Sequence, residues 1–380
     1  MKSIIIHATS ISDLTKKIEE KTEDFTPTLA IVYNSPAYDI RKLVTELNCF
    51  PFLVFGSTTV GEIYADDEKG ANETNNSIVC MLIDINLDAI SLKLFQANGD
   101  KCYESGQEVA TWSKEQFPNS TLTPAIVTVT SGLTFDTEAY SQGISAEKIE
   151  YVFGGIAGDD LLLKETFVYS KDNFSNHGMI VLAIDRDKVD VLGARAFGWG
   201  GIGRERIVTK STKNIVYEID GRPAIEFYQK YLNAMSTDMP QIGIEYPLEV
   251  KMRDGHVAYR AALAIDEEAG ALIFGGHIEE NSKIKLATVK GKEIINHVTR
   301  SITEVLEENP NFTPEIGLLF PCCSRKYVLA DYAIQEIETI FDKAKVPLVG
   351  FFAYGEIGVF PGGYGFQNET FVTAFLSEKE

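Results

Sequence analysis

Three short stretches of the chain join glycine to an acidic residue in a pattern that could hold a small molecule. They are GSTTVGE (56–62), FGGIAGDD (153–160) and GFFAYGE (350–356), and their acids are Glu62, Asp159 and Glu356. Glycine lets backbone N–H groups approach a ligand carboxylate, while the acid can face a ligand ammonium group. Glycine turns closed by an acid also occur without a ligand, so a purely structural role is the open alternative.

The third stretch has reactive neighbours. Cys322 and Arg325 follow the apolar run GLLFP, which predicts a buried strand, and the ends of such strands often carry ligand groups. Arg325 could hold a carboxylate through two hydrogen bonds. Cys322 could be a nucleophile only beside a base, and is otherwise a small buried apolar residue. The predicted ligand-binding residues are Gly56, Ser57, Gly61, Glu62, Gly155, Asp159, Cys322, Arg325, Phe351, Tyr354, Gly355 and Glu356.

Other kinds of site find less support in the sequence. GWGGIG (198–203) has the glycine spacing of a dinucleotide site, but a strand-like stretch follows it where that site needs a helix. The five histidines are scattered, and any of them could ligate a haem iron from an apolar pocket. His177 and His277 border predicted strand ends, so they are the predicted axial ligands if haem is bound. No metal site or other cofactor is predicted.

The composition is that of a globular protein with a strongly acidic balance. Among 380 residues, 35 Lys and Arg stand against 55 Asp and Glu, and the formal charge of −20 repels nucleic acid and anionic membranes. No apolar run approaches the ~20 residues that span a bilayer, and the start does not resemble a signal peptide. Five cysteines without a C-x-x-C pair suit a reducing compartment. We therefore expect a cytoplasmic protein with no nucleic-acid or membrane partner.

A repeat larger than the glycine turns runs through the chain. FTPTLAIVY (25–33), LTPAIVTVT (122–130) and FTPEIGLLF (312–320) each predict a buried strand with proline near its start. Each copy is flanked by helical patterns, continues to a second strand that enters a glycine turn, and closes with a third strand. The repeat predicts a mixed α/β fold of three strand–helix–strand–helix–strand units, in mixed sheets flanked by helices. The units lie at about 1–86, 87–190 and 283–380, and a β-rich α+β segment at 206–282 is inserted before the third.

The ordered set of these phrases resembles the FIST family, a bacterial sensory module of paired FIST N and FIST C regions. The resemblance is carried by VFGSTTVGEI (54–63), FGGIAGDD (153–160), IDGRPAIEFY (219–228), the C-x-x-R stretch at 322–325, VPLVGFFAYGEIG (346–358) and NET (368–370). It implies a FIST N-like region at 1–205, made of the first two units, and a FIST C-like region at 206–380.

The resemblance implies a stand-alone, non-enzymatic intracellular sensor that binds a small amino-acid-like molecule. Such a sensor signals through a separate partner, which is a histidine kinase, a diguanylate cyclase or phosphodiesterase, or a chemoreceptor. Two alternatives stay open. One is a haem-binding nitric oxide sensor that regulates a histidine kinase or a cyclic-di-GMP enzyme. The other is an enzyme with Cys322 as nucleophile, for which the sequence supplies no paired base.

Overall fold

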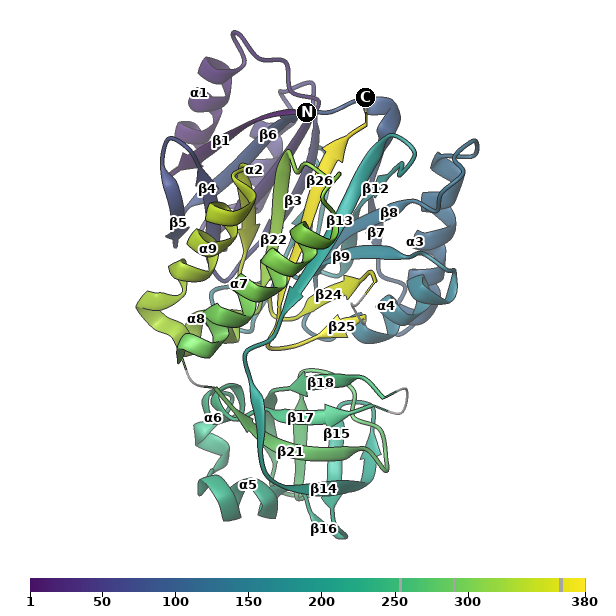
Figure 1. Ribbon diagram of the computed structural model, residues 1–380, viewed down its shortest axis with the longest axis vertical. Coiled ribbons are helices and arrows are strands. Elements are labelled where there is room, and N and C mark those ends of the chain that lie inside the picture. Colours follow the sequence, from purple (N-terminus) through teal and green to yellow (C-terminus); the bar gives the residue numbers. More distant parts are fainter. Residues whose placement is uncertain (253–254, 290, 362–364, 380) are drawn as a thin grey trace.

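The computed structural model describes residues 1–252, 255–289, 291–361 and 365–379, and these residues form two parts (Figure 1). The upper part in that view holds three six-stranded sheets, and the lower part holds one eight-stranded sheet with helices α5 and α6. Helices flank the sheets, and the sheets mix parallel and antiparallel pairs. The predicted class, mixed α/β with a β-rich insertion, is confirmed.

Three units of similar element order build the upper part. The first consists of β1 (Lys2–Ala8), α1 (Ile11–Lys21), β2 (Leu29–Asn34), α2 (Ile40–Leu47), β3 (Leu53–Thr58), β4 (Glu62–Asp66), β5 (Gly70–Thr74) and β6 (Ile78–Asp84). The second consists of the 3₁₀ helix η1 (Leu87–Ala89), β7 (Ile90–Gln96), α3 (Cys102–Gln116), β8 (Ala125–Thr130), α4 (Thr137–Ala146), β9 (Tyr151–Ile156), β10 (Val168–Tyr169), β11 (Phe174–Ser175) and β12 (Gly178–Ile184).

The third unit is split around the lower part. It consists of β13 (Val189–Ala196), α7 (Gly291–Glu308), β22 (Ile316–Pro321), α8 (Cys323–Leu329), η3 (Ala330–Tyr332), α9 (Ile334–Ala344), β23 (Leu348–Phe351), β24 (Glu356–Val359), β25 (Phe366–Gln367) and β26 (Phe371–Glu378). β13 pairs with β26 along its whole length, as β1 pairs with β6 and β7 with β12. The first strand of this unit therefore precedes the insertion in the sequence.

Each upper sheet contains four strands of its own unit and two strands of another. The first sheet runs β1-β6-β2-β3 and continues with β10 and β11 of the second unit. The second sheet, β7-β12-β8-β9, continues with β24 and β25 of the third unit. The third sheet, β13-β26-β22-β23, continues with β4 and β5 of the first unit. The three units therefore exchange these strand pairs in a closed ring.

The three glycine–acid turns are the points where the chain leaves one sheet and enters the next. Backbone hydrogen bonds, written here with the donor first, tie the turns together: Val60 to Phe352 at 3.1 Å, Gly158 to Thr58 at 3.0 Å, and Ile156 to Gly355 at 2.9 Å. The turn recurs in the sequence because this crossover recurs in the fold.

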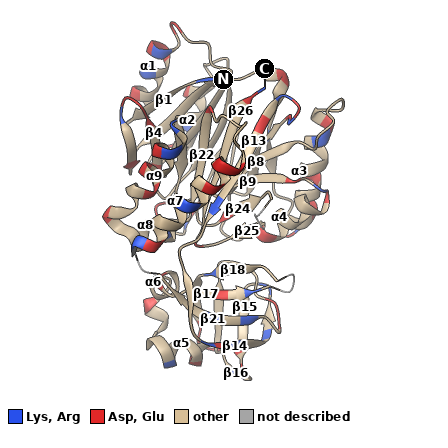
Figure 2. Ribbon diagram, in the orientation of Figure 1, with Lys and Arg blue, Asp and Glu red and all other residues tan. Residues whose placement is uncertain are grey.

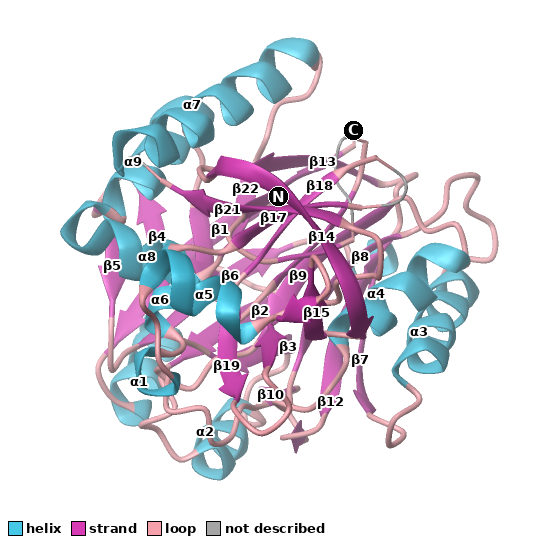
Figure 3. Ribbon diagram, turned by 90° about the horizontal axis from the view of Figure 1, so that it is seen from below, coloured by secondary structure: helices cyan, strands magenta, loops and turns pink. Residues whose placement is uncertain are grey.

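The central strands of the upper sheets are buried on both faces. Along β2, Leu29, Ile31 and Tyr33 face a core shared by the three sheets, whereas Ala30 and Val32 pack against α1 and α2. β8 and β22 alternate in the same way, with α3 and α4 over the second sheet and α7 and α9 over the third. Seen from below, α1, α2, α3, α7 and α9 lie around the strands (Figure 3). Burial on both faces explains the nearly continuous apolar runs of the sequence.

The lower part is formed by residues between β13 and α7. Its elements are β14 (Gly200–Thr212), β15 (Ile215–Ile219), β16 (Arg222–Pro223), α5 (Ile225–Leu232), η2 (Ser236–Asp238), α6 (Gln241–Glu245), β17 (Leu248–Lys251), β18 (Val257–Arg260), β19 (Ala262–Asp266), β20 (Ala271–Phe274) and β21 (Lys283–Thr288). GWGGIG continues into strand β14, so the helix that a dinucleotide site needs does not follow it. β14 and β21 are paired neighbours, so the two connections to the upper part run side by side.

Charged residues of both signs are interspersed along the outer helices. Figure 2 marks both acidic and basic positions on outer helices such as α1 and α7. Exposed ion pairs of this kind, such as Lys16–Glu20 at 3.7 Å, contribute little to stability. The fold depends on its packed sheets instead.

Gly158 tests the contact between the turns. A Cβ atom there would lie 2.4 Å from Val60 Cγ2 and 2.7 Å from the Thr59 carbonyl carbon. Because the backbone of the turn has to move, we expect Gly158→Ala to lower the free energy of unfolding by about 1–3 kcal/mol in a urea titration. Gly200→Ala is the matched control, since nothing lies within 4 Å of its added atom, and it should change that free energy by less than about 0.5 kcal/mol. Equal losses in both variants would contradict the close packing of the turns.

Candidate functional site

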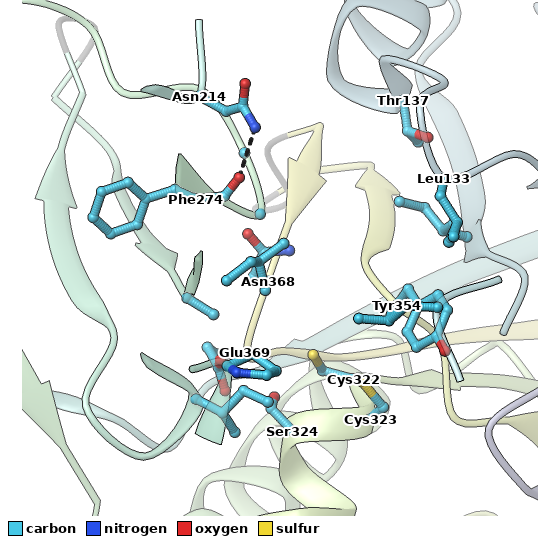
Figure 4. A pocket seen from close by; sticks show the side chains of 18 of the residues that line it. Leu133, Thr137, Asn214, Phe274, Cys322, Cys323, Ser324, Tyr354, Asn368 and Glu369 are labelled. Atoms are coloured by element: carbon cyan, nitrogen blue, oxygen red, sulfur yellow. Dashed lines mark hydrogen bonds between the residues drawn. The ribbon is translucent and has the colours of Figure 1, made fainter. Parts of the chain in front are cut away.

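A cavity of about 810 Å³ lies where the second unit, the third unit and the lower part meet. The second unit contributes the loops that precede α4 and follow β9, and the third contributes the start of α8, Tyr354 and the segment between β25 and β26. The lower part closes the cavity with residues from several of its loops and strands, including Asn214 and Phe274. Figure 4 shows these side chains around a common space. The volume lies within the range of small-molecule sites.

Asn368 and Glu369 are the most unusual polar residues of the cavity wall. They stand between β25 and β26, and Glu369 has the left-handed backbone angle φ +64°, which is strained for a residue with a side chain. Asn368 is 3% exposed and Glu369 is 0% exposed. Within the described part of the chain, Asn368 Oδ1 and both carboxylate oxygens of Glu369 have no hydrogen-bond partner. Buried polar atoms are normally paired, so these oxygens mark a place where a ligand group fits.

The carboxyl group of Glu369 is tuned to change charge near neutral pH. Burial raises the pKa of Glu369 to about 8, although the Ser324 hydroxyl and the Arg325 guanidinium oppose the rise. A carboxyl group with such a pKa gains or loses its proton readily when a charged molecule arrives. Glu369 is therefore a group on the wall whose charge can respond to a bound molecule.

Arg325 lies behind the wall, and its guanidinium is already engaged. Nε donates to Glu336 Oε2 at 3.2 Å, Nη2 donates to the other Glu336 oxygen, and Nη1 donates to the Glu369 carbonyl at 3.0 Å. Arg325 is fully buried and is not among the residues that line the cavity. The arginine thus fixes the backbone at Glu369, and a ligand carboxylate would have to displace Glu336 to reach it.

Cys322 lines the cavity at the start of α8, next to Cys323 and Ser324 (Figure 4). Burial raises the pKa of the Cys322 thiol well above its ordinary value, and the nearby Cys323 and Glu369 add to the rise. A nucleophilic cysteine needs the opposite shift, because the thiolate is the reactive form. The surroundings of Cys322 therefore suit a residue that shapes the cavity.

The predicted residues of the third turn are divided between the cavity and the interior. Tyr354 lines the cavity, whereas Phe351 lies in the core shared by the three sheets. Glu356 accepts hydrogen bonds from the Thr370 N–H at 3.1 Å and from the Thr370 hydroxyl at 2.7 Å, and burial raises its pKa. Gly355 lies against the ring of Phe366, where a Cβ atom would approach to 2.6 Å. Phe351, Gly355 and Glu356 thus support the wall from behind.

The predicted residues of the first and second turns lie outside the cavity lining. Glu62 accepts hydrogen bonds from the Thr59 hydroxyl at 2.5 Å and the Ser77 hydroxyl at 2.6 Å, and burial raises its pKa to about 7. Asp159 accepts the Tyr354 hydroxyl and three consecutive backbone N–H groups at 163–165, and so shapes a loop that borders the cavity. Gly56, Ser57, Gly61 and Gly155 are buried around the turns.

Of the two predicted histidines, His277 lines the cavity and His177 does not. His277 Nε2 lies 3.1 Å from Asp136 Oδ2, and Lys213 pairs with the same carboxylate at 3.2 Å. Burial would lower the pKa of His277, but the hydrogen bond to Asp136 and the nearby Glu138 raise it. An axial haem ligand presents a neutral, unengaged ring nitrogen to the iron. Because Nε2 faces Asp136 and the ring is stabilised in its charged form, this nitrogen is engaged and a haem iron would have to displace Asp136 to bind it.

Buried charges also hold the lower part against the second unit beside the cavity. Arg260, which is 1% exposed, donates from Nη2 to Glu138 Oε1 at 3.1 Å. The other oxygen of Glu138 accepts the His277 N–H at 2.5 Å. Glu138 belongs to the first turn of α4, so this pair joins the two parts across the rim of the cavity.

Among the residues that the structure describes, no group of three or more His, Cys, Asp or Glu side chains could hold a metal ion. In the same residues, no helix is long and apolar enough to cross a membrane.

Asn368, Glu369 and Ser324 were not among the residues predicted to bind a ligand. NET (368–370) supported the family resemblance, but nothing in the sequence alone set its asparagine and glutamate apart from an ordinary turn. A usable signal is the match to NNS (75–77), which precedes the closing strand of the first unit as NET precedes that of the third. Two copies of a polar triplet in equivalent places indicate a second recurring turn.

A cavity enclosed between two parts of a chain, with unpaired polar groups on its wall, is typical of proteins that bind small molecules. The chain also matches two domains of a known protein family. The FIST N domain matches residues 28–222, and the FIST C domain matches residues 224–359. The chain therefore belongs to the FIST family, whose domains are sensory domains of signal transduction, and the resemblance found in the sequence is confirmed.

The boundary between the two matches falls inside the lower part, at β16 just before α5, so this part contains residues of both domains. Two uncharacterized proteins from two strains of Mycobacterium tuberculosis are also similar to the chain. Each is 26% identical over 175 residues, which covers 42% of this chain and 44% of the relative. The match thus spans less than half the length of these curated relatives.

The Arg325–Glu336 pair can be tested for its contribution to the stability of the cavity wall. Glu336→Ala leaves a buried guanidinium without its carboxylate, so we expect a loss of about 3–5 kcal/mol in the free energy of unfolding, measured with urea. Glu338→Ala, at an exposed position on the same helix, is the control and should change it by less than about 0.5 kcal/mol. A small effect of Glu336→Ala would show that Arg325 does not depend on this partner.

Glu369 should make stability depend on pH. The folded protein keeps a proton on Glu369 up to about pH 8, whereas the unfolded chain releases it near pH 4.3. Between these values the folded state binds more protons, so stability falls as the pH rises. We expect Glu369→Gln to remove this contribution, so that its free energy of unfolding falls less than that of the wild type between about pH 5 and pH 8, by up to a few kcal/mol. Parallel pH profiles would contradict the raised pKa.

Proposed function

We propose that this FIST protein is a non-enzymatic intracellular sensor whose signal is a small amino-acid-like molecule bound in the cavity between its two parts. The observation that supports the proposal is that, within the described residues, the buried side-chain oxygens Asn368 Oδ1 and Glu369 Oε1 and Oε2 have no hydrogen-bond partner. Such groups cost free energy until a partner reaches them. A polar ligand is the partner that the cavity has room for.

The lower part is the element through which binding reaches the rest of the protein. The cavity is lined by both parts, so a ligand that contacts both favours the arrangement in which they are close. β14 and β21 form two adjacent connections, which suits a limited rotation of one part against the other. The closed arrangement is the state that a signalling partner distinguishes.

We assign the output to a separate protein: a histidine kinase, a diguanylate cyclase or phosphodiesterase, or a chemoreceptor. The support is the family, whose domains serve signal transduction. The two other functions considered from the sequence have less support. A haem iron would have to compete with Asp136 for His277 Nε2, and an enzyme would need an activated Cys322.

A ligand screen tests the proposal. Amino acids and related small molecules are added to the protein, and a true ligand should raise its melting temperature in a concentration-dependent way. At a ligand concentration of a hundred times the Kd, the added free energy of stability should be about 2.7 kcal/mol. Ser324→Phe places a large ring where the cavity wall is, so the same compounds should no longer stabilise that variant. Asn368→Ala should weaken the effect.

The matched control is Asn75→Ala, the equivalent position of the first unit, which lies outside the cavity lining. Its response to the ligand should equal that of the wild type. Compounds that stabilise the Ser324→Phe and Asn368→Ala variants as strongly as the wild type bind elsewhere, and they would refute the assignment of this cavity.

A further inference from the structure

The first unit contains a site equivalent to the cavity wall around Asn368 and Glu369, and the ammonium group of Lys326 occupies it. Lys326 Nζ donates to the Val60 carbonyl at 3.1 Å and to Asn75 Oδ1 at 2.6 Å, and it pairs with Glu73 at 3.2 Å. Gly61 makes room for it, because a Cβ atom there would lie 2.4 Å from Nζ. We call this arrangement of a glycine-turn carbonyl, here Val60, and an asparagine oxygen, here Asn75 Oδ1, the cradle. In the first unit the cradle binds an ammonium group of the protein itself.

The two places correspond in position and in hydrogen bonding. NNS (75–77) and NET (368–370) precede the closing strands β6 and β26. Their central residues, Asn76 and Glu369, both have a left-handed backbone, with φ +52° and +64°. Their last residues donate a hydroxyl to the acid of the adjacent glycine turn, from Ser77 to Glu62 and from Thr370 to Glu356.

Asn368 is therefore the counterpart of Asn75, which binds the lysine. In the third unit the carboxylate of Glu369 is added beside this asparagine, and within the described residues Asn368 Oδ1 has no partner. At this position Glu369 replaces the neutral Asn76, and no lysine among the described residues donates to Asn368 Oδ1. The chemistry of this cradle calls for an ammonium group from outside.

The charges around Glu369 leave one positive charge missing. Arg325 pairs with the Glu336 carboxylate and donates to the Glu369 backbone carbonyl, and its charge also acts on the Glu369 carboxyl group. Arg325, Glu336 and an ionised Glu369 together carry one net negative charge. The other titratable groups that face Glu369 are Cys322 and Tyr228, and burial raises the pKa of each, which keeps both neutral. An unbalanced buried carboxylate is costly, and a cation beside it removes that cost.

The cavity offers little to a ligand carboxylate. The basic residues on its described lining are Lys213 and His277, and Asp136 holds both. Glu138 and Asp238 add further acidic groups to the lining. A ligand with a free carboxylate would have to compete with Asp136 for its partners.

We propose that the ligand is an organic amine whose ammonium group binds Glu369 and Asn368, and that a ligand carboxylate is not required for binding. This inference rests on the proposed function and narrows the amino-acid-like molecule to its cationic end. The apolar body of the amine lies toward Leu133, Tyr354 and Phe366, which also line the cavity. The ligand class is a primary amine with an aliphatic or aromatic side chain.

Two matched series of compounds test the inference on the full-length protein. The first is isoamylamine, leucinamide, leucine and N-acetylleucine, and the second is phenylethylamine, phenylalaninamide, phenylalanine and N-acetylphenylalanine. Dissociation constants are measured by titration calorimetry near pH 8. The amines and amides should bind, the N-acetyl compounds should bind at least tenfold more weakly, and Glu369→Gln should weaken the amines by roughly tenfold to a hundredfold.

Glu356→Gln is the matched control, because Glu356 is a buried carboxyl group of the same unit that is outside the cavity lining. It should keep the preference for amines. If the free amino acids bind while their amides and amines do not, the ligand class is wrong and the cavity assignment stands. If no compound of either series or of the broader screen stabilises the protein, the proposed function fails, and this inference fails with it.

Proton release separates recognition of a cation from simple filling of the cavity. At pH 7 the Glu369 carboxyl group of the free protein is mostly protonated, so an ammonium ligand has to expel about one proton. Calorimetry in two buffers of different ionisation enthalpy measures this number directly. Wild-type protein should release about one proton per amine bound, and Glu369→Gln should release none. Amine binding without proton release, at an affinity that Glu369→Gln leaves unchanged, would overturn the inference.

Discussion

The close approach of the three glycine–acid turns is the constraint on which the rest of the structure depends. At these turns backbone meets backbone: a Cβ atom at Gly155 would lie 2.6 Å from the Gly355 carbonyl oxygen. Only residues without a side chain allow the three crossovers to meet, and only their meeting lets each unit complete another unit's sheet. Because the exchange closes into a ring, every upper sheet contains strands from two units. We therefore expect the upper part to behave as one cooperative body, against which the lower part can move.

The sequence predicted the repeated units but not the exchange between them. Apolar runs such as LTPAIVTVT predict a buried strand, and their recurrence predicts a repeated unit. A strand's neighbours, however, depend on pairings between distant residues, and no local pattern distinguishes a strand that pairs within its unit from one that pairs outside it. β13 illustrates the limit, since it completes the third unit although the whole lower part separates it from α7. The function of the glycine turns was therefore visible only in three dimensions.

The sequence predicted the region of the candidate site but not its central residues, Asn368 and Glu369. Tyr354 and Cys322 line the cavity, as the choice of the third turn implied. The acids of the turns drew attention because an acid after glycine can bind an ammonium group, yet Glu62 and Glu356 accept hydroxyl groups of their own unit. The sequence suggested that Arg325 could bind a ligand carboxylate. Its actual partner, Glu336, lies eleven residues later and could be recognised only from the fold. A sequence does not show whether a polar side chain already has a hydrogen-bond partner elsewhere in the chain.

The difference between the three units explains why the candidate cavity lies at the third unit. In the first unit the cradle is filled, because Lys326 reaches it from α8. In the second, Asp159 is used to hold the loop at 163–165 and the Tyr354 hydroxyl. In the third, the cradle keeps its asparagine, gains Glu369 and is covered by the lower part, which is inserted into that same unit. The insertion helps to enclose Glu369, which is 0% exposed, and a charge in such surroundings interacts strongly with whatever neutralises it.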